Sequence, residues 1–137
     1  MKISKIAGIV GILLCLGSVS LMAQTVRVGG YSLRANGNIA QGFHYTGSCP
    51  VDLKFGWGLI STRRTEAIYR FDRSDGGHTT KPERVDIPQA NHSVPVYYDW
   101  QLGANTPKFA DFHGWVNIII EAPNPVQQKI NFTIHCR

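Results

Sequence analysis

The strongest constraint on the fold of this chain is an alternation of apolar and polar side chains along most of its length. Apolar residues occupy every second position in the ranges 51–59, 67–71, 94–102 and 130–134, with polar residues or glycine between most of them. Because successive side chains of a β-strand point to opposite faces of a sheet, this pattern predicts strands with one buried face. Residues 115–120 are more continuously apolar, with Asn117 as the one polar residue, and predict a central strand.

Turn-forming residues separate the predicted strands. Residues 61–65 link the first two, Ser74–Gly77 ends with two glycines, and the prolines of Ala122–Pro125 break the chain before the last strand. Short strands separated by turns at this spacing predict an all-β fold, an antiparallel β-sandwich. No stretch of the mature chain shows the 3.6-residue repeat of an amphipathic helix.

Residues 24–44 carry weaker signals. We predict that they form an N-terminal extension or edge strands, with short strands at 26–28 and 39–43. Gly29-Gly30 and Asn36-Gly37 are the expected turns, since glycine and asparagine tolerate turn conformations.

The first 23 residues have the three parts of a secretory signal peptide. Lys2 and Lys5 are followed by an apolar run from Ile6 to Leu16, and Ala23 precedes the expected cleavage point. Two alternatives are a retained membrane anchor and a lipoprotein modified at Cys15. The apolar run is short for a spanning helix, which needs about 20 residues. We therefore expect a secreted or periplasmic protein with a cleavable Sec-type signal.

Composition narrows the class of partner. Cleavage would leave 114 of the 137 residues, a length that suits one domain, and would lower the formal charge from +5 to +3. The basic residues are dispersed, whereas nucleic-acid binding usually needs a dense basic patch. No second apolar segment is long enough to span a membrane. We expect neither nucleic-acid binding nor stable membrane insertion.

Three cysteines become two once the signal is removed. Cys49 has the same parity as the apolar positions of residues 51–59, and Cys136 has the parity of those in 130–134. Both sulfurs are therefore predicted to point inward, as a disulfide between facing sheets requires. In the chain-entropy model such a closure contributes up to about 4–5 kcal/mol. The alternative is two free buried thiols, which an oxidising compartment disfavours.

Five short motifs before a terminal cysteine resemble those of a group of exported bacterial immunoglobulin-like domains. In order they are Tyr45-Thr46-Gly47-Ser48-Cys49-Pro50, residues 68–76 ending in Ser74-Asp75-Gly76, Asp99-Trp100-Gln101-Leu102-Gly103, Gly114-Trp115-Val116, and Ala122-Pro123-Asn124-Pro125 before Cys136. The resemblance covers about residues 45–136. It implies an immunoglobulin-like β-sandwich at 45–137 with Cys49 and Cys136 paired, and no enzymatic activity. Phe71 stands where the family commonly has tryptophan.

Metal and cofactor motifs are weak in this sequence. The five histidines, at 44, 78, 92, 113 and 135, include no pair at ligand spacing, and we predict no metal and no cofactor. We expect His135 to point outward and the histidines at 78, 92 and 113 to lie in loops. Asp72–Gly76 lacks the ligand pattern of a calcium loop, and fits a turn that Asp75 caps and Gly76 completes with a positive φ.

No catalytic constellation is evident either. The chain has no G-x-S-x-G nucleophile motif, and an oxidised cysteine pair leaves no thiol nucleophile. Glu66, Glu83 and Glu121 are candidates for an acidic pair of the glycosidase kind, although their spacing does not favour it. We predict no catalytic residues and treat a small hydrolase as an alternative.

Four arginines, Arg63, Arg64, Arg70 and Arg73, gather around one predicted hairpin. Arg70 and Arg73 have opposite parity, so one straight strand does not present them on one face. Their simplest role is solvation and protection of a sheet edge. The sharper hypothesis is that the four bind an anionic ligand.

These observations favour a non-catalytic exported module that binds a protein or glycan partner. Loops at the sandwich ends or an exposed sheet edge are the expected recognition surfaces. An inhibitor or immunity-type protein that blocks an envelope enzyme is a second hypothesis, which rests only on size, export and rigidity.

Overall fold

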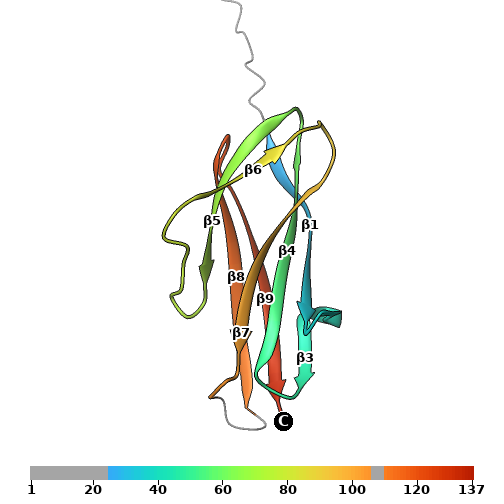
Figure 1. Cartoon of the computed structure of the whole chain (residues 1–137), viewed down its shortest axis with the longest axis vertical. Coiled ribbons are helices and arrows are strands. Elements are labelled where there is room, and N and C mark those ends of the chain that lie inside the picture. The colour runs from blue at the N-terminus through green and yellow to red at the C-terminus, as the bar shows by residue number, and fades with distance from the viewer. Residues whose placement is uncertain (1–24, 106–109) are drawn as a thin grey trace, which may run out of the picture.

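The protein folds as two β-sheets that pack face to face (Figure 1). The structure is a computed structural model, and it describes residues 25–105 and 110–137. The four-stranded sheet has the order β2 (Asn38–Ile39), β1 (Val26–Ala35), β4 (Val51–Ser61), β7 (Val94–Leu102). The five-stranded sheet has the order β3 (His44–Gly47), β9 (Val126–Cys136), β8 (Asp111–Ala122), β5 (Thr65–Arg73), β6 (Glu83–Ile87). This confirms the predicted all-β, two-sheet sandwich.

One strand pair departs from the predicted antiparallel arrangement. β3 runs parallel to β9, from His44 opposite Thr133 to Gly47 opposite Cys136. The chain leaves β2 through a short 3-10 helix, η1 (Gln41–Phe43), and enters the five-stranded sheet beside its last strand. No hairpin joins β3 to β9, so the two strands need not be antiparallel.

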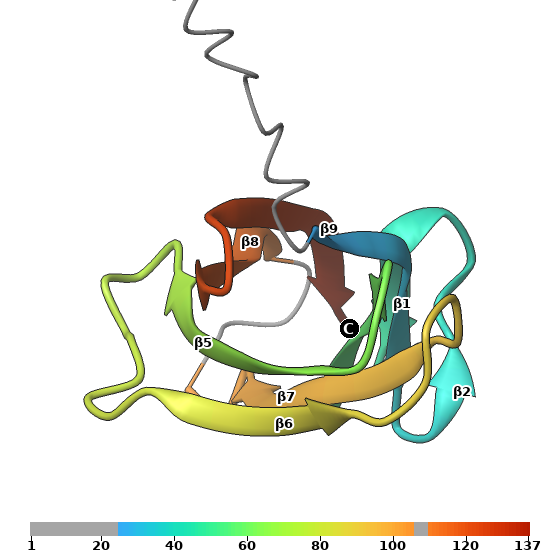
Figure 2. The same ribbon diagram turned by 90° about the horizontal axis from the view of Figure 1, so that it is seen from above.

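The core lies between the sheets and consists of the alternating residues that the sequence predicted. Every odd-numbered position from Val51 to Leu59 in β4 is almost fully buried, as are Ile130 and Ile134 in β9. Phe55 of β4 meets Phe132 of β9 at 5.1 Å between ring centroids. Burial of each large apolar side chain contributes about 1.5–3 kcal/mol. Figure 2 shows this layering from above, with β8 and β9 on one side and β7 on the other.

Cys49 and Cys136 form the predicted disulfide, which joins the residues entering β4 to the end of β9. Their Cα atoms are 5.4 Å apart. Gly103, with φ of +89°, packs against this bridge, and a Cβ there would lie 2.7 Å from Cys49 Cβ. The backbone after β7 can approach the disulfide this closely only with glycine at position 103.

The N-terminal segment is more regular than the sequence suggested. β1 pairs with β4 from Val26 to Ala35, and the expected turn at Gly29-Gly30 is instead a β-bulge within this pairing. The expected strand at 39–43 is divided between the end of β2 and η1. The expected turn at Asn36-Gly37 is present, with positive φ at both residues. β6 was not predicted, since its five residues carry little apolar alternation.

The predicted signal peptide, residues 1–23 with Cys15, lies outside the described residues. Within the part of the chain that the structure describes, no helix combines the length and apolar character that crossing a membrane requires.

Candidate functional site

The four arginines do not form one cluster. Arg63 and Arg64 lie in the turn between β4 and β5, whereas Arg73 ends β5. The nine residues of β5 place Arg73 roughly 30 Å from Arg64. The turn carries the chain from one sheet to the other, because β4 and β5 belong to different sheets. The expected gathering around one hairpin was therefore wrong, and the anionic-ligand role of these arginines stays a prediction.

Arg70 and Arg73 both make intramolecular contacts. Arg70 donates to Glu121 at 2.7 Å and to Asp72 at 3.1 Å on the outer face of the five-stranded sheet. Arg73 donates to Asp75 at 2.8 Å, and its guanidinium lies 4.5 Å from the ring centroid of Trp100 in β7. Arg73 therefore links the end of β5 to the opposite sheet.

The Ser74–Gly77 turn has the predicted form. Gly76 has φ of +89°, and the backbone N–H of Gly77 donates to Asp75 Oδ1 at 2.8 Å. Burial alone would raise the pKa of Asp75, but hydrogen bonds from Arg73 and Gly77 outweigh it and hold the pKa below its ordinary value. Asp75 thus stabilises both the turn and the position of Arg73.

Three histidines lie on one face of a sheet, although the sequence shows no regular spacing that would predict this. Thr133 stands opposite both His113 and His44, and His135 stands opposite Asp111, so all three rings belong to the outer face of the five-stranded sheet. His113 lies in β8, not in the expected loop. Among residues 25–105 and 110–137, no group of three His, Cys, Asp or Glu side chains is arranged to hold a metal ion.

The three glutamates named as acidic candidates are spread over the same sheet and contact other side chains. Glu66 pairs with Arg84 at 2.7 Å, and Glu121 pairs with Arg70. Burial, together with a hydrogen bond and the charge of Glu83, raises the pKa of Tyr69 to about 12.

The outer face of the four-stranded sheet has a different character, because its long central strand carries glycines there. Strand pairing places Gly56 between Ser32 and Tyr97, and Gly58 between Gly30 and Pro95. Without side chains at positions 56 and 58, the middle of this sheet lies lower than its flanks. We call this outer surface the glycine face and define it by these residues: Gly30, Ser32, Arg34, Ile39, Asp52, Lys54, Gly56, Gly58, Pro95, Tyr97, Asp99, Gln101.

Large apolar side chains are exposed on this sheet. Ile39 on β2 is 63% exposed and Tyr97 on β7 is 53% exposed, and both belong to the glycine face. Tyr31 on β1 is also exposed, and its ring stacks on Phe43 at 5.6 Å. Among the described residues, these three are the large apolar side chains with substantial exposure, and all belong to the four-stranded sheet.

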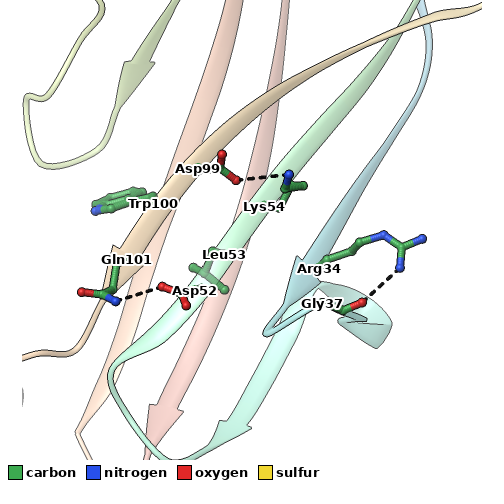
Figure 3. A pocket seen from close by; sticks show the side chains of 8 residues that line it. All are labelled: Arg34, Gly37, Asp52, Leu53, Lys54, Asp99, Trp100 and Gln101. Carbon is green, nitrogen blue, oxygen red and sulfur yellow. Dashed lines mark hydrogen bonds and ion pairs between the residues drawn. The ribbon is translucent and has the colours of Figure 1, made fainter.

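A hollow of about 380 Å³ lies at the lower half of the glycine face (Figure 3). Lys54 Nζ lies 3.7 Å from an Asp99 oxygen and 5.2 Å from the Tyr97 ring centroid. Gln101 donates to Asp52 at 2.9 Å. Figure 3 shows Arg34 on β1, on the other side of β4 from Gln101. Arg34 donates a hydrogen bond to the carbonyl of Gly37 at 3.2 Å.

A second hollow of about 340 Å³ lies on the same sheet, around Gly56, Gly58 and Tyr97. A Cβ at Gly58 would lie 2.4 Å from Ser93 Oγ, and one at Gly56 would lie 3.1 Å from the Tyr97 ring. Because Gly56 and Gly58 have no side chains, the side chains of Ser93 and Tyr97 can lie close to the backbone of β4. The polar groups around the first hollow are positioned by internal hydrogen bonds and an ion pair.

The glycine face was not predicted as a site from the sequence. The sequence does contain a signal for this face, because Gly56 and Gly58 occupy outward positions of the strongest predicted strand. Strand pairing, which single-strand alternation does not reveal, brings Tyr97, Ile39 and the charged pairs to these glycines.

Comparison with protein-family models and with curated proteins found no match to this chain.

Proposed function

We propose that this protein is an exported, non-catalytic binding module that recognises another protein through the glycine face. The observation that carries the proposal is the exposure of Ile39 and Tyr97 on the face that also holds Arg34 and the Lys54–Asp99 pair. Export rests on the N-terminal sequence, and the finer assignment to immunoglobulin-like domains rests on the motif resemblance.

Protein interfaces combine features of this kind. Their cores are enriched in aromatic residues and arginine, and their rims are polar. Tyr97 offers a large, rigid ring with little rotamer entropy to lose, and Arg34 offers a planar set of donors. The hollows beside Tyr97 provide space for side chains of the partner. Tyr97→Ala is expected to weaken binding by about 30-fold, the effect of a typical hot-spot residue.

Site-specific photo-crosslinking tests the proposal. A benzoylphenylalanine replaces Tyr97 in one variant and Gln127, an exposed residue on the outer face of the opposite sheet, in the other. Irradiation of native cells should give a discrete protein adduct from position 97 and none from position 127. The Tyr97 adduct should disappear when Gly58 is also replaced by leucine. Equal adducts from both positions, or an adduct from 127 alone, would refute this interface.

The identity of the adduct also decides the inhibitor hypothesis. A stoichiometric complex with an envelope hydrolase, together with loss of that hydrolase's activity, would specify the module as an inhibitor. A complex with a structural or receptor protein would specify an adhesin-type module.

A glycan partner is the second candidate for the same face. The hollow of Figure 3 combines Asp52, Gln101, Lys54 and Asp99, which together offer both donors and acceptors to sugar hydroxyls. Binding of purified protein to immobilised glycans, lost in Gln101→Ala and retained in Gln127→Ala, would favour this candidate over a protein partner.

Asp52 and Asp99 also revive the acidic-pair alternative. They line one hollow on neighbouring strands in diagonal positions, which places the two residues about 7–8 Å apart. The acid of such a pair normally lies in an apolar pocket that keeps it protonated, whereas the Asp99 side chain is 74% exposed beside Lys54. Hydrolysis of a glycoside by the wild type, abolished in Asp99→Asn, would establish an enzyme in place of a binding module.

A further inference from the structure

A separate hollow of about 310 Å³ lies on the outer face of the five-stranded sheet, away from the glycine face. Three elements line it: η1 with Gly42 and Phe43, β8 around Trp115, and β9 around Asn131. We call it the Trp115 hollow. It was not foreseen because it depends on η1 lying against β9.

Trp115 is an outward residue of β8 that is held in place from two sides. Its backbone N–H donates to Ser74 Oγ at 3.1 Å. Its ring carries Lys129 Nζ at 4.0 Å from the ring centroid. A half-exposed indole beside a hollow is a platform for the C–H groups of a flat, partly apolar ring.

Polar side chains stand beside this indole. Asn131 lies directly opposite Trp115 in the β8–β9 pairing and is exposed. His113 Nδ1 hydrogen bonds with Thr133 Oγ1 at 3.0 Å, and both residues line the hollow. The His113 Nε2 atom makes no hydrogen bond within the described part of the chain. The hollow therefore offers amide, hydroxyl and imidazole groups next to an aromatic ring.

The charges around the hollow favour an anion. On β9, Lys129 has no carboxylate within ion-pair distance among the described residues. His113 on β8 and His44 on β3 flank Thr133. η1 contributes no charged residue.

The nearby carboxylates already have side-chain partners. Asp111 on β8 pairs with His135 on β9. Asp72 on β5 shares a cross-strand row with Lys129 but pairs with Arg70 at 3.1 Å. Lys129 is therefore the charged side chain beside Trp115 that has no ion-pair partner among the described residues.

We propose that the Trp115 hollow binds a carboxylated sugar of the hexuronate class, whose ring stacks on Trp115 while its carboxylate meets Lys129 and His113. The aromatic platform selects a sugar over a simple anion. The positive charge of Lys129 selects a uronate over a neutral hexose. This site is on the opposite sheet from the glycine face, so its success or failure is independent of the proposed function.

Titration followed by NMR tests the proposal. The wild-type protein is titrated with glucuronate, glucose and acetate, and the indole N–H signal of Trp115 is followed. Glucuronate should move this signal and bind about three- to fivefold more tightly than glucose, the range expected for one solvent-exposed charge pair. Equal affinity for glucose, acetate that moves the signal as strongly, or no movement of the indole signal would overturn the proposal.

Matched variants locate the site. Lys129→Gln should reduce glucuronate affinity about three- to fivefold, whereas Lys81→Gln, at an exposed position that lines neither hollow, should leave it unchanged. Trp115→Ala should abolish binding, and Trp115→Phe should retain part of it, which separates loss of the platform from loss of the fold. Equal effects of the two lysine substitutions would overturn the assignment to this hollow.

Discussion

The two outer faces of this sandwich rest on the same core but differ in what stands at their centres. On the four-stranded sheet, β4 presents Gly56 and Gly58, and the surface is hollow. On the five-stranded sheet, β8 presents Asn117 and Ile119, which are only 7% and 9% exposed because neighbouring side chains cover them. Arg70 and Gln127 flank Ile119 in the strand pairing.

This difference shows how one β-scaffold separates stability from recognition. The middle of the five-stranded face is covered by ion pairs and amides that satisfy one another. The glycine face leaves Ile39 and Tyr97 uncovered and contributes little side-chain packing. Residues of the same type should therefore have unequal effects on the free energy of unfolding, depending on the face that carries them.

The largest expected effect tests whether the two sheets unfold as one cooperative unit. Replacing Cys49 and Cys136 by alanine removes a link between positions 87 residues apart. The free energy of unfolding should fall by about 2–5 kcal/mol. In urea, tryptophan fluorescence and far-UV circular dichroism should still report one transition. Two separate transitions would mean that the two sheets unfold independently.

Two isoleucines give the sharpest comparison of the faces. Ile119→Ala should lower the free energy of unfolding by about 2 kcal/mol or more, because it opens a cavity under covering side chains. Ile39→Ala should change it by less than about 0.5 kcal/mol, because the residue is exposed. Chemical denaturation of both variants measures the difference. Similar losses at the two positions would contradict the contrast between a packed and an open face.

Two residues that form ion pairs, one on each face, should show the same contrast with smaller changes in stability. Arg70→Met removes contacts to both Glu121 and Asp72, and should cost about 1 kcal/mol. Lys54→Met removes one exposed contact at 3.7 Å to Asp99, and should cost less than about 0.5 kcal/mol. High salt should narrow the gap between the variants, since salt screens exposed charges. A greater loss of stability in Lys54→Met than in Arg70→Met would contradict the stabilising role assigned to the five-stranded face.

The smallest effect concerns Asp75, which holds Arg73 where the two sheets meet. The folded-state pKa of Asp75 lies below its unfolded-state value, so its contribution to stability is present above about pH 4 and lost as the pH falls further. Asp75→Asn should be less stable than the wild type at pH 6, and the gap should close toward pH 2. Thermal melts across this range measure it, and a gap that widens in acid would contradict the account.

The sequence predicted the features that depend only on the residues of one strand or turn. Alternation identified the buried positions of β4, β5 and β9, and parity directed both cysteines to the core. Ser74–Gly77 has a local turn signature, and its Asp75 and Gly76 act as that signature predicts.

Features that depend on strand pairing were not predictable in this way. The approach of His113 to Thr133, and of Tyr97 to Gly56, follows from register between strands far apart in the sequence. The arginines were misplaced for a related reason, since nothing local shows that β5 crosses to the other sheet. Both candidate sites lie on surfaces that this pairing creates.

The most direct test of the central claim is an amide NMR map of the protein with its crosslinked partner in purified form. The account predicts that shift changes concentrate at Ser32, Gly56, Gly58 and Tyr97, on the glycine face. The amides of β8 and β9 around Asn117 and Gln127 should remain unchanged. Shift changes confined to β8 and β9, with the glycine face unaffected, would contradict it.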